Sequence, residues 1–113
     1  MLELKSTMAD NDVLVIEMRV DNLDASNVRE FKEAVQAKIQ DRTRVVLDMT
    51  GVKFVDSSGL GALISCLRLL NGQKGDFKLC NLSKTVRALF ELMRMHRVFN
   101  IFDAREEAVR SFA

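Results

Sequence analysis

Apolar residues in the first twenty positions recur at every second residue, a spacing typical of β-strands. Residues 2–8 and residues 13–20 both show this alternation, and Ala9–Asp12 supplies turn residues between them. In the second run the apolar face consists of Leu14, Ile16, Met18 and Val20. Glu17 and Arg19 fall on the other face. The pattern predicts an N-terminal hairpin whose second strand is half-buried.

The apolar spacing then lengthens to three or four residues, which is typical of an amphipathic helix. The positions concerned are Val28, Phe31, Val35 and Ile39. We predict a helix over about residues 25 to 40. Asp24 precedes it and can accept hydrogen bonds from the amides of Ser26 or Asn27.

Strand and helix patterns alternate through the middle of the chain. The continuous run Val45–Leu47 indicates a strand covered on both faces. After Thr50–Gly51, residues 54–55 lead to Asp56, where a helical stripe begins. Its apolar residues are Leu60, Leu63, Ile64, Leu67 and Leu70. The helix is expected to end at Asn71–Gly72, a pair suited to a left-handed cap.

The last third of the chain repeats the alternation. It predicts a strand at residues 77–80, a helix from Ser83, a short strand near residues 98–101, and a helix capped by Asp103 with Glu106 three residues on. The inward residues of the Ser83 helix are expected to be Val86, Leu89, Phe90 and Met93. Helical crossovers favour parallel strands. We therefore expect one α/β domain over residues 1–113, with a mixed sheet of four to five strands opened by the hairpin and flanked by about four helices.

Composition narrows the class of protein. The 113 residues are 48% apolar and 29% charged, with a formal charge of +1 and no long run of like charges, so nothing indicates a nucleic-acid partner. No apolar stretch approaches the ~20 residues of a membrane span. The N-terminus also lacks the pattern of a secretory signal. We expect a cytoplasmic protein that does not insert into a membrane.

Cysteine, histidine and carboxylate positions give no sign of a cofactor. Cys66 and Cys80 lie 14 residues apart, outside metal-binding spacings, and are interpreted as reduced, partly buried thiols. We expect neither a metal nor another cofactor. His96, the only histidine, is expected on the surface or at a helix end. The apolar cluster at Phe90, Met93, Met95, Phe99 and Phe102 is interpreted as core.

The segment Asp56-Ser57-Ser58-Gly59-Leu60-Gly61 lies where a strand passes into a helix, so its hydroxyl and amide groups are expected at the end of the sheet. A helix N-terminus favours anionic groups, including a phosphoryl group on Ser57. The same spacing also fits a plain helix cap formed by Asp56 or Ser57.

Four enzyme templates fail on this segment. A dinucleotide fingerprint requires a glycine where Ile64 stands, and the Gly-Lys-Ser/Thr of a phosphate loop is absent. A nucleophile elbow requires glycines two residues on either side of the serine, but Val55 and Asp56 stand two residues before Ser57 and Ser58. A triad requires a histidine, and His96 lies about forty residues away. Asp48, at the end of a predicted strand, also suggests an aspartyl-phosphate receiver. This chain, however, lacks the acidic pair that a receiver has after its first βα unit. We therefore expect a protein that is not an enzyme.

The stretch Leu47–Gly61 closely resembles the STAS domain of bacterial anti-sigma factor antagonists, and the similarity extends to Asn22–Ala25 and Leu79–Ser83. The resemblance implies partner switching. The unphosphorylated antagonist binds an anti-sigma factor that is also a serine kinase, which frees the sigma factor. The kinase then phosphorylates the antagonist, and a serine phosphatase reverses the modification.

By the same resemblance, Ser57 occupies the acceptor position, with Ser58 as the second choice. Asp24 and Asp56 match acidic positions near the acceptor. Residues implied near the site or in partner contact are Asp24, Asp56, Ser58, Gly59, Leu60 and Gly61. The chain departs from the family at Val20-Asp21, Ser83-Lys84 and residues 95–97, where a glycine, a Ser-Pro pair and another glycine are usual. An alternative is a structural STAS module in a stress-sensing complex or a lipid-transporter assembly.

Overall fold

The N-terminal hairpin forms as predicted in the computed structural model, which describes residues 2–113. Strands β1 (Leu4–Ala9) and β2 (Val13–Met18) pair antiparallel. The short 3-10 turn η1 (Asp10–Asp12) joins them, with Asn11 and Asp12 in left-handed backbone conformation at φ 62° and 59°. Asn and Asp tolerate this conformation better than most residues, which explains why the turn forms here.

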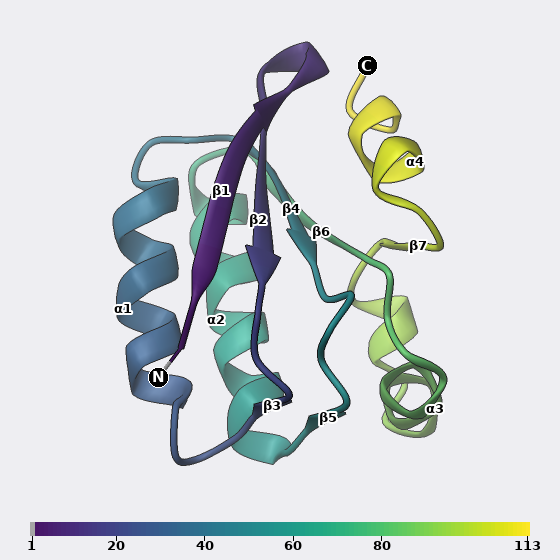
Figure 1. Ribbon diagram of the computed structural model, residues 1–113. Helices are drawn as coiled ribbons and strands as arrows, with labels where there is room; N and C mark the ends of the chain where they lie inside the picture. Colours follow the sequence, from purple (N-terminus) through teal and green to yellow (C-terminus); the bar gives the residue numbers. More distant parts are fainter. Residues whose placement is uncertain (1) are drawn as a thin grey trace.

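The hairpin opens a five-stranded sheet with the order β1-β2-β4-β6-β7 (Figure 1). Strands β4 (Arg44–Asp48), β6 (Asp76–Cys80) and β7 (Ile101–Phe102) all run parallel to β2. This mixed sheet confirms the predicted α/β fold. A second, two-stranded sheet pairs β3 (Asn22–Leu23) with β5 (Phe54–Val55) in parallel. The sequence did not predict that pairing.

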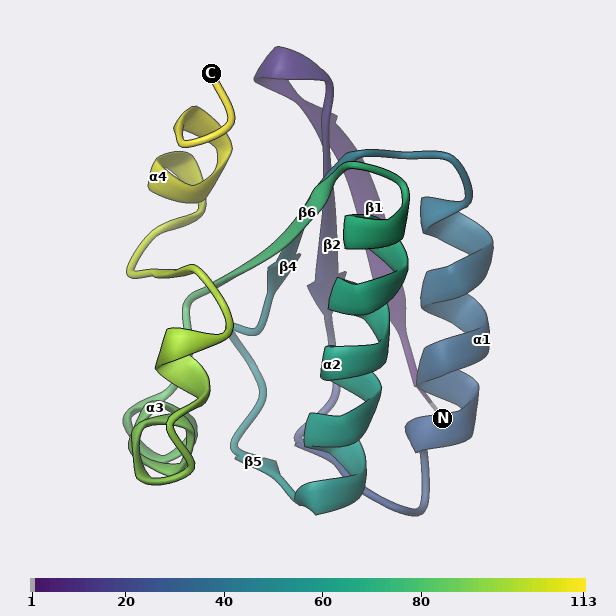
Figure 2. The same ribbon diagram turned by 180° about the vertical axis from the view of Figure 1, so that it is seen from behind.

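Four α-helices flank the sheet: α1 (Val28–Ile39), α2 (Ser57–Gly72), α3 (Lys84–Leu92) and α4 (Arg105–Arg110). Helices α1 and α2 lie side by side against one face, seen in front in Figure 2. A short 3-10 turn, η2 (Met95–Arg97), follows α3. Within residues 2–113, no helix combines the length and apolarity that crossing a membrane requires.

The sheet is buried on both faces. Val45 and Leu47 face the core under α1 and α2, whereas Val46 faces Ala108 and Val109 of α4. This confirms the prediction for the Val45–Leu47 strand. The half-buried prediction for β2 is wrong over its first part, because α4 covers the second face there. Both Val13 and Val15 are buried beneath that helix.

Two helix ends differ from the prediction. Helix α1 begins at Val28 rather than near residue 25, because Asp24 closes a turn with the amide of Ser26 before the helix starts. Helix α2 continues through Gly72, and the left-handed residue is Lys74, at φ 64°. Gly75 follows because any Cβ there would lie 2.5 Å from Thr43 Cα.

The C-terminal third shows three further differences. Met93 is exposed rather than inward, because α3 ends at Leu92 and Arg94 turns the chain in left-handed conformation. Strand β7 covers Ile101–Phe102, later than the predicted 98–101. Asp103 does not cap α4: it pairs with Arg87 at 2.8 Å, and Glu107 accepts the Ala104 amide instead.

Candidate functional site

The Asp56–Gly61 segment forms the start of α2, directly after β5. Asp56 is the N-cap, and its Oδ1 accepts a hydrogen bond from the amide of Gly59 at 2.8 Å. Ser57 and Ser58 are the first two helical residues, and both are exposed. Asp56 therefore caps the helix, and Ser57 remains exposed at its start.

A second loop, residues 22–27, lies beside this helix start because β3 pairs with β5. Leu23 O accepts from the amide of Asp56 at 3.1 Å, and Asp56 Oδ2 accepts from the amide of Ala25 at 3.2 Å. Asp24 Oδ1 accepts from both the amide and the hydroxyl of Ser26, at 2.9 and 2.5 Å. The structure thus holds Asp24 and Asp56, which are far apart in the sequence, on adjoining loops.

The two carboxylates give this end of the molecule a local negative charge. The Ser26 hydroxyl and amide, by donating to Asp24, hold the pKa of its carboxyl below the ordinary value. Asp56 occupies both of its oxygens with backbone amides. The first-turn amides of Ser57 and Ser58 have no intrahelical acceptor. The site therefore combines an exposed hydroxyl, a helix N-terminus and two nearby acids.

The glycines and leucine of the motif serve different purposes. Gly59 is buried, and a Cβ at this position would overlap Leu23 O and lie 2.9 Å from Leu23 Cγ. Leu60 points into the core at 4% exposure. Gly61 is exposed, with nothing within 4 Å of where its Cβ would be. Gly59 and Leu60 thus fix the helix start from beneath, whereas Ser57, Ser58 and Gly61 reach the surface.

A polar cluster that the sequence did not predict lies at the end of β4 on the face covered by α4. Asp48 is 2% exposed and accepts from Arg105 Nη2 at 2.7 Å, from the Thr50 hydroxyl at 2.5 Å and from Asn81 at 3.1 Å. Arg105 also reaches Glu17 at 3.3 Å. Arg105 therefore ties α4 to β2 and β4, and Asn81, the residue after β6, bonds to the same carboxylate of Asp48.

Burial alone would raise the pKa of Asp48, but the hydrogen bonds from Thr50, Arg105 and Asn81 together hold it below its ordinary value. The pKa of Arg105 is raised, mainly by its hydrogen bonds to Asp48. The one sign of this cluster in the sequence is Asp48, an acidic residue at the end of a buried strand. Arg105 lies 57 positions further along the chain, so no local pattern indicates the pairing.

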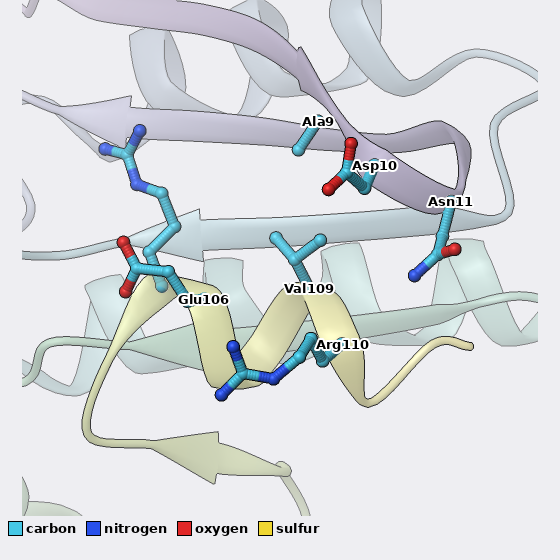
Figure 3. A pocket seen from close by; sticks show the side chains of 7 residues that line it. Ala9, Asp10, Asn11, Glu106, Val109 and Arg110 are labelled. Atoms are coloured by element: carbon cyan, nitrogen blue, oxygen red, sulfur yellow. The ribbon is translucent and has the colours of Figure 1, made fainter.

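A groove of about 710 Å³ lies between the η1 turn and α4 (Figure 3). It is lined by Ala9, Asp10, Asn11, Arg105, Glu106, Val109 and Arg110. Figure 1 places the η1 turn and the start of α2 at opposite ends of the molecule. The groove is therefore separate from the Ser57 site.

The remaining candidate residues add no chemistry to the site. Cys66 and Cys80 are free, as predicted, and fully buried; burial raises their thiol pKa values to about 11 and about 12. His96 is exposed within η2. Among residues 2–113, no group of His, Cys, Asp and Glu side chains is arranged to hold a metal ion.

A mixed sheet opened by an antiparallel hairpin, with an exposed serine starting the second helix, defines a small α/β domain of the STAS type. The family model for the STAS domain matches residues 6–108, and the chain belongs to this family, within its anti-sigma factor antagonists.

Several relatives are similar over almost their whole length. BtrV of Bordetella bronchiseptica is 26% identical over 110 residues, which cover 96% of this chain and 95% of the relative. The anti-sigma-B factor antagonist of Listeria monocytogenes is 26% identical over 106 residues, covering 94% and 91%. The structure of the antagonist SpoIIAA in its unphosphorylated form superposes with a TM-score of 0.77 at 25% identity, covering 95% and 93%. Anti-sigma factor antagonists are non-enzymatic regulators, which confirms the expectation that the chain is not an enzyme.

Proposed function

We propose that this chain is a phosphorylation-controlled antagonist of an anti-sigma factor. Its unphosphorylated form binds an anti-sigma factor that is also a serine kinase, and this binding frees the sigma factor. The kinase phosphorylates Ser57, which ends the binding, and a serine phosphatase restores the unphosphorylated form.

The exposed Ser57 hydroxyl at the start of α2 carries the proposal. A kinase has to bring the hydroxyl to the γ-phosphate of ATP, so an acceptor must reach the surface. Ser57 does so, whereas the adjoining cap, Asp56, is occupied by the amides of Gly59 and Ala25. The similar Bacillus protein SpoIIAA is known in a phosphorylated form, which supports the same chemistry here.

The charges around Ser57 explain how phosphorylation would end binding. A phosphoryl group adds about −1.5 to −2 charges at neutral pH. The helix N-terminus and its free amides offset part of this charge within the chain. Across the interface, however, the added charge joins Asp24 and Asp56 on the same surface. Docking would then have to desolvate three anionic groups, which weakens binding to a closely packed partner.

The test uses purified chain and the anti-sigma factor kinases encoded in its source genome, each with radiolabelled ATP. We expect one kinase to label the wild type and to leave Ser57→Ala unlabelled while still binding it. Ser58→Ala is the matched control, because Ser58 is the adjacent exposed serine of the same helix turn; this variant should be labelled like the wild type.

Label on Ser57→Ala at the wild-type level would contradict the assignment of Ser57. Loss of label from Ser58→Ala alone would move the acceptor to Ser58. If no kinase binds or labels the wild type, the proposed function is wrong.

A further inference from the structure

Three large apolar side chains are exposed within residues 92–98, where α3 ends. Leu92 is 82% exposed, Val98 46% and Met93 43%. Single exposed apolar residues are common on soluble proteins, but grouped ones mark interaction sites. We call the exposed part of residues 92–98 the 92–98 surface.

The 92–98 surface is a fixed part of the fold rather than a frayed helix end. Arg94 turns the chain at φ 59°, and the amides of Val98 and Phe99 both donate to Met95 O at 3.0 Å. Phe99 is 2% exposed and packs against Phe90, with ring centroids 6.0 Å apart. The segment is thus anchored from beneath while Leu92 and Val98 stay exposed.

The same surface is basic. Arg94 and Arg97 are exposed beside the apolar side chains, together with His96, and residues 92–98 contain no acid. Among residues 2–113, no ion pair holds either arginine within the chain. Even with the exposed Glu91 directly before it, this segment has a net positive charge. An apolar centre flanked by positive charge is complementary to an apolar patch with acidic side chains at its edge.

The 92–98 surface begins where α3 ends, and α3 lies at the same end of the molecule as the start of α2 (Figure 1). Helix α3 packs against β5, and β5 packs against α2. Figure 2 shows α3, β5 and the start of α2 in sequence along this end. Phe54 of β5, the strand that contacts both helices, is a further exposed apolar residue at 47% exposure.

We infer that the 92–98 surface is the second half of the docking site for the protein that phosphorylates Ser57, and that it receives an apolar patch bordered by acidic side chains on that partner. This inference rests on the proposed function. A protein fits better than an anionic membrane, because the acids Asp24 and Asp56 at the same end would be repelled by a negatively charged bilayer.

A docking site made of two parts, the Ser57 site and the 92–98 surface, would respond to phosphorylation in only one of them. Phosphorylation changes the charge at Ser57 but leaves the 92–98 surface unaltered. Contacts there would be common to both states, and would keep the kinase near Ser57 while it transfers the phosphoryl group. Discrimination between the two states would then rest on the Ser57 half.

The test measures affinity by calorimetry for the kinase that labels the wild type. Leu92→Ser and Val98→Ser should each weaken binding about tenfold, as expected when a central apolar interface residue is removed. Arg97→Glu should weaken binding and reduce its dependence on salt concentration. Met8→Ser is the matched control: Met8 is 45% exposed on β1, the opposite edge of the sheet from β7. Its affinity should equal that of the wild type.

Circular dichroism should show all four variants folded, because the substituted side chains are exposed. Unchanged affinity of Leu92→Ser and Val98→Ser for a kinase that binds the wild type would overturn the inference and leave the proposed function standing. Binding of the wild type to phosphatidylglycerol vesicles, lost in Leu92→Ser, would overturn it in favour of a membrane. If no kinase binds the wild type, both proposals fail.

Discussion

Replacing Gly59 by alanine tests whether the start of α2 is fixed by its close approach to Leu23. A Cβ at this position would overlap Leu23 O and lie 2.9 Å from Leu23 Cγ. The carbonyl cannot simply move away, because it accepts the Asp56 amide at 3.1 Å. Either the β3 loop shifts or the first turn of α2 shifts.

The expected change in the free energy of unfolding is the sum of opposing contributions. Overpacking costs about 1–3 kcal/mol, and weakening the hydrogen bond between Leu23 and Asp56 costs about 1 kcal/mol more. Alanine is the better helix former by about 1 kcal/mol. The free energy of unfolding should therefore fall by about 1–3 kcal/mol, which lowers the melting temperature by about 4–13 °C for a chain of this size.

Gly61→Ala is the matched control, since it makes the same chemical change two residues later in the same helix. Nothing lies within 4 Å of its added Cβ, so helix propensity alone should raise stability by up to about 1 kcal/mol. Thermal and urea unfolding followed by circular dichroism measure both variants. If Gly59→Ala were as stable as Gly61→Ala, the steric reasoning would be refuted.

Two further predictions concern buried polar groups. Asp48→Asn should lower stability by about 1–3 kcal/mol, because Arg105 loses the nearer of its two charged partners and keeps only Glu17. Asp103→Asn, at an exposed pair, should cost less than about 1 kcal/mol. Since the folded-state pKa of Asp48 lies below its unfolded value of about 3.9, its contribution is complete at neutral pH and is lost as the pH falls through the folded-state pKa. Urea unfolding at several pH values should show less acid sensitivity in Asp48→Asn; identical profiles would contradict this. Finally, Cys66 and Cys80 should react with a thiol reagent at pH 8 only after unfolding, because burial raises their pKa values to about 11 and about 12; rapid reaction of the folded chain would refute it.

Much of the fold could be predicted because it follows from local periodicity. The alternation in β2 and the helical stripes of α1 and α2 identify those elements directly. The two-residue strands β3 and β5 were missed because they are too short to show a period, and their pairing joins positions 22–23 to 54–55. The burial of both β2 faces did have a signal. Residues 13–16 form a continuous apolar run, the pattern by which β4 was predicted to be covered on both faces.

The candidate site likewise has one part that could be predicted from the sequence and one part that could not. The turn at Asp56 and the helix start at Ser57 are local and follow from the sequence, which leaves the cap open between Asp56 and Ser57. The bond from Asp56 to Ala25 and the pairing of Asp48 with Arg105 span 31 and 57 positions, so only the folded chain shows them. The wrong cap at Asp103 has the same cause: Arg87, 16 positions away, pairs with its carboxylate.

These long-range bonds also bear on how the proposed switch would work. Asp56 joins the two loops at the Ser57 end through its side chain and its amide, and the Lys53 amide adds a bond to Asp21 O at 2.6 Å. The exposed Ser57 hydroxyl lies outside this network, so a phosphoryl group could be added without displacing any of these bonds. The change would then be one of surface charge rather than fold. Phosphorylated and unphosphorylated chains should accordingly unfold at similar urea concentrations while differing strongly in affinity for the kinase.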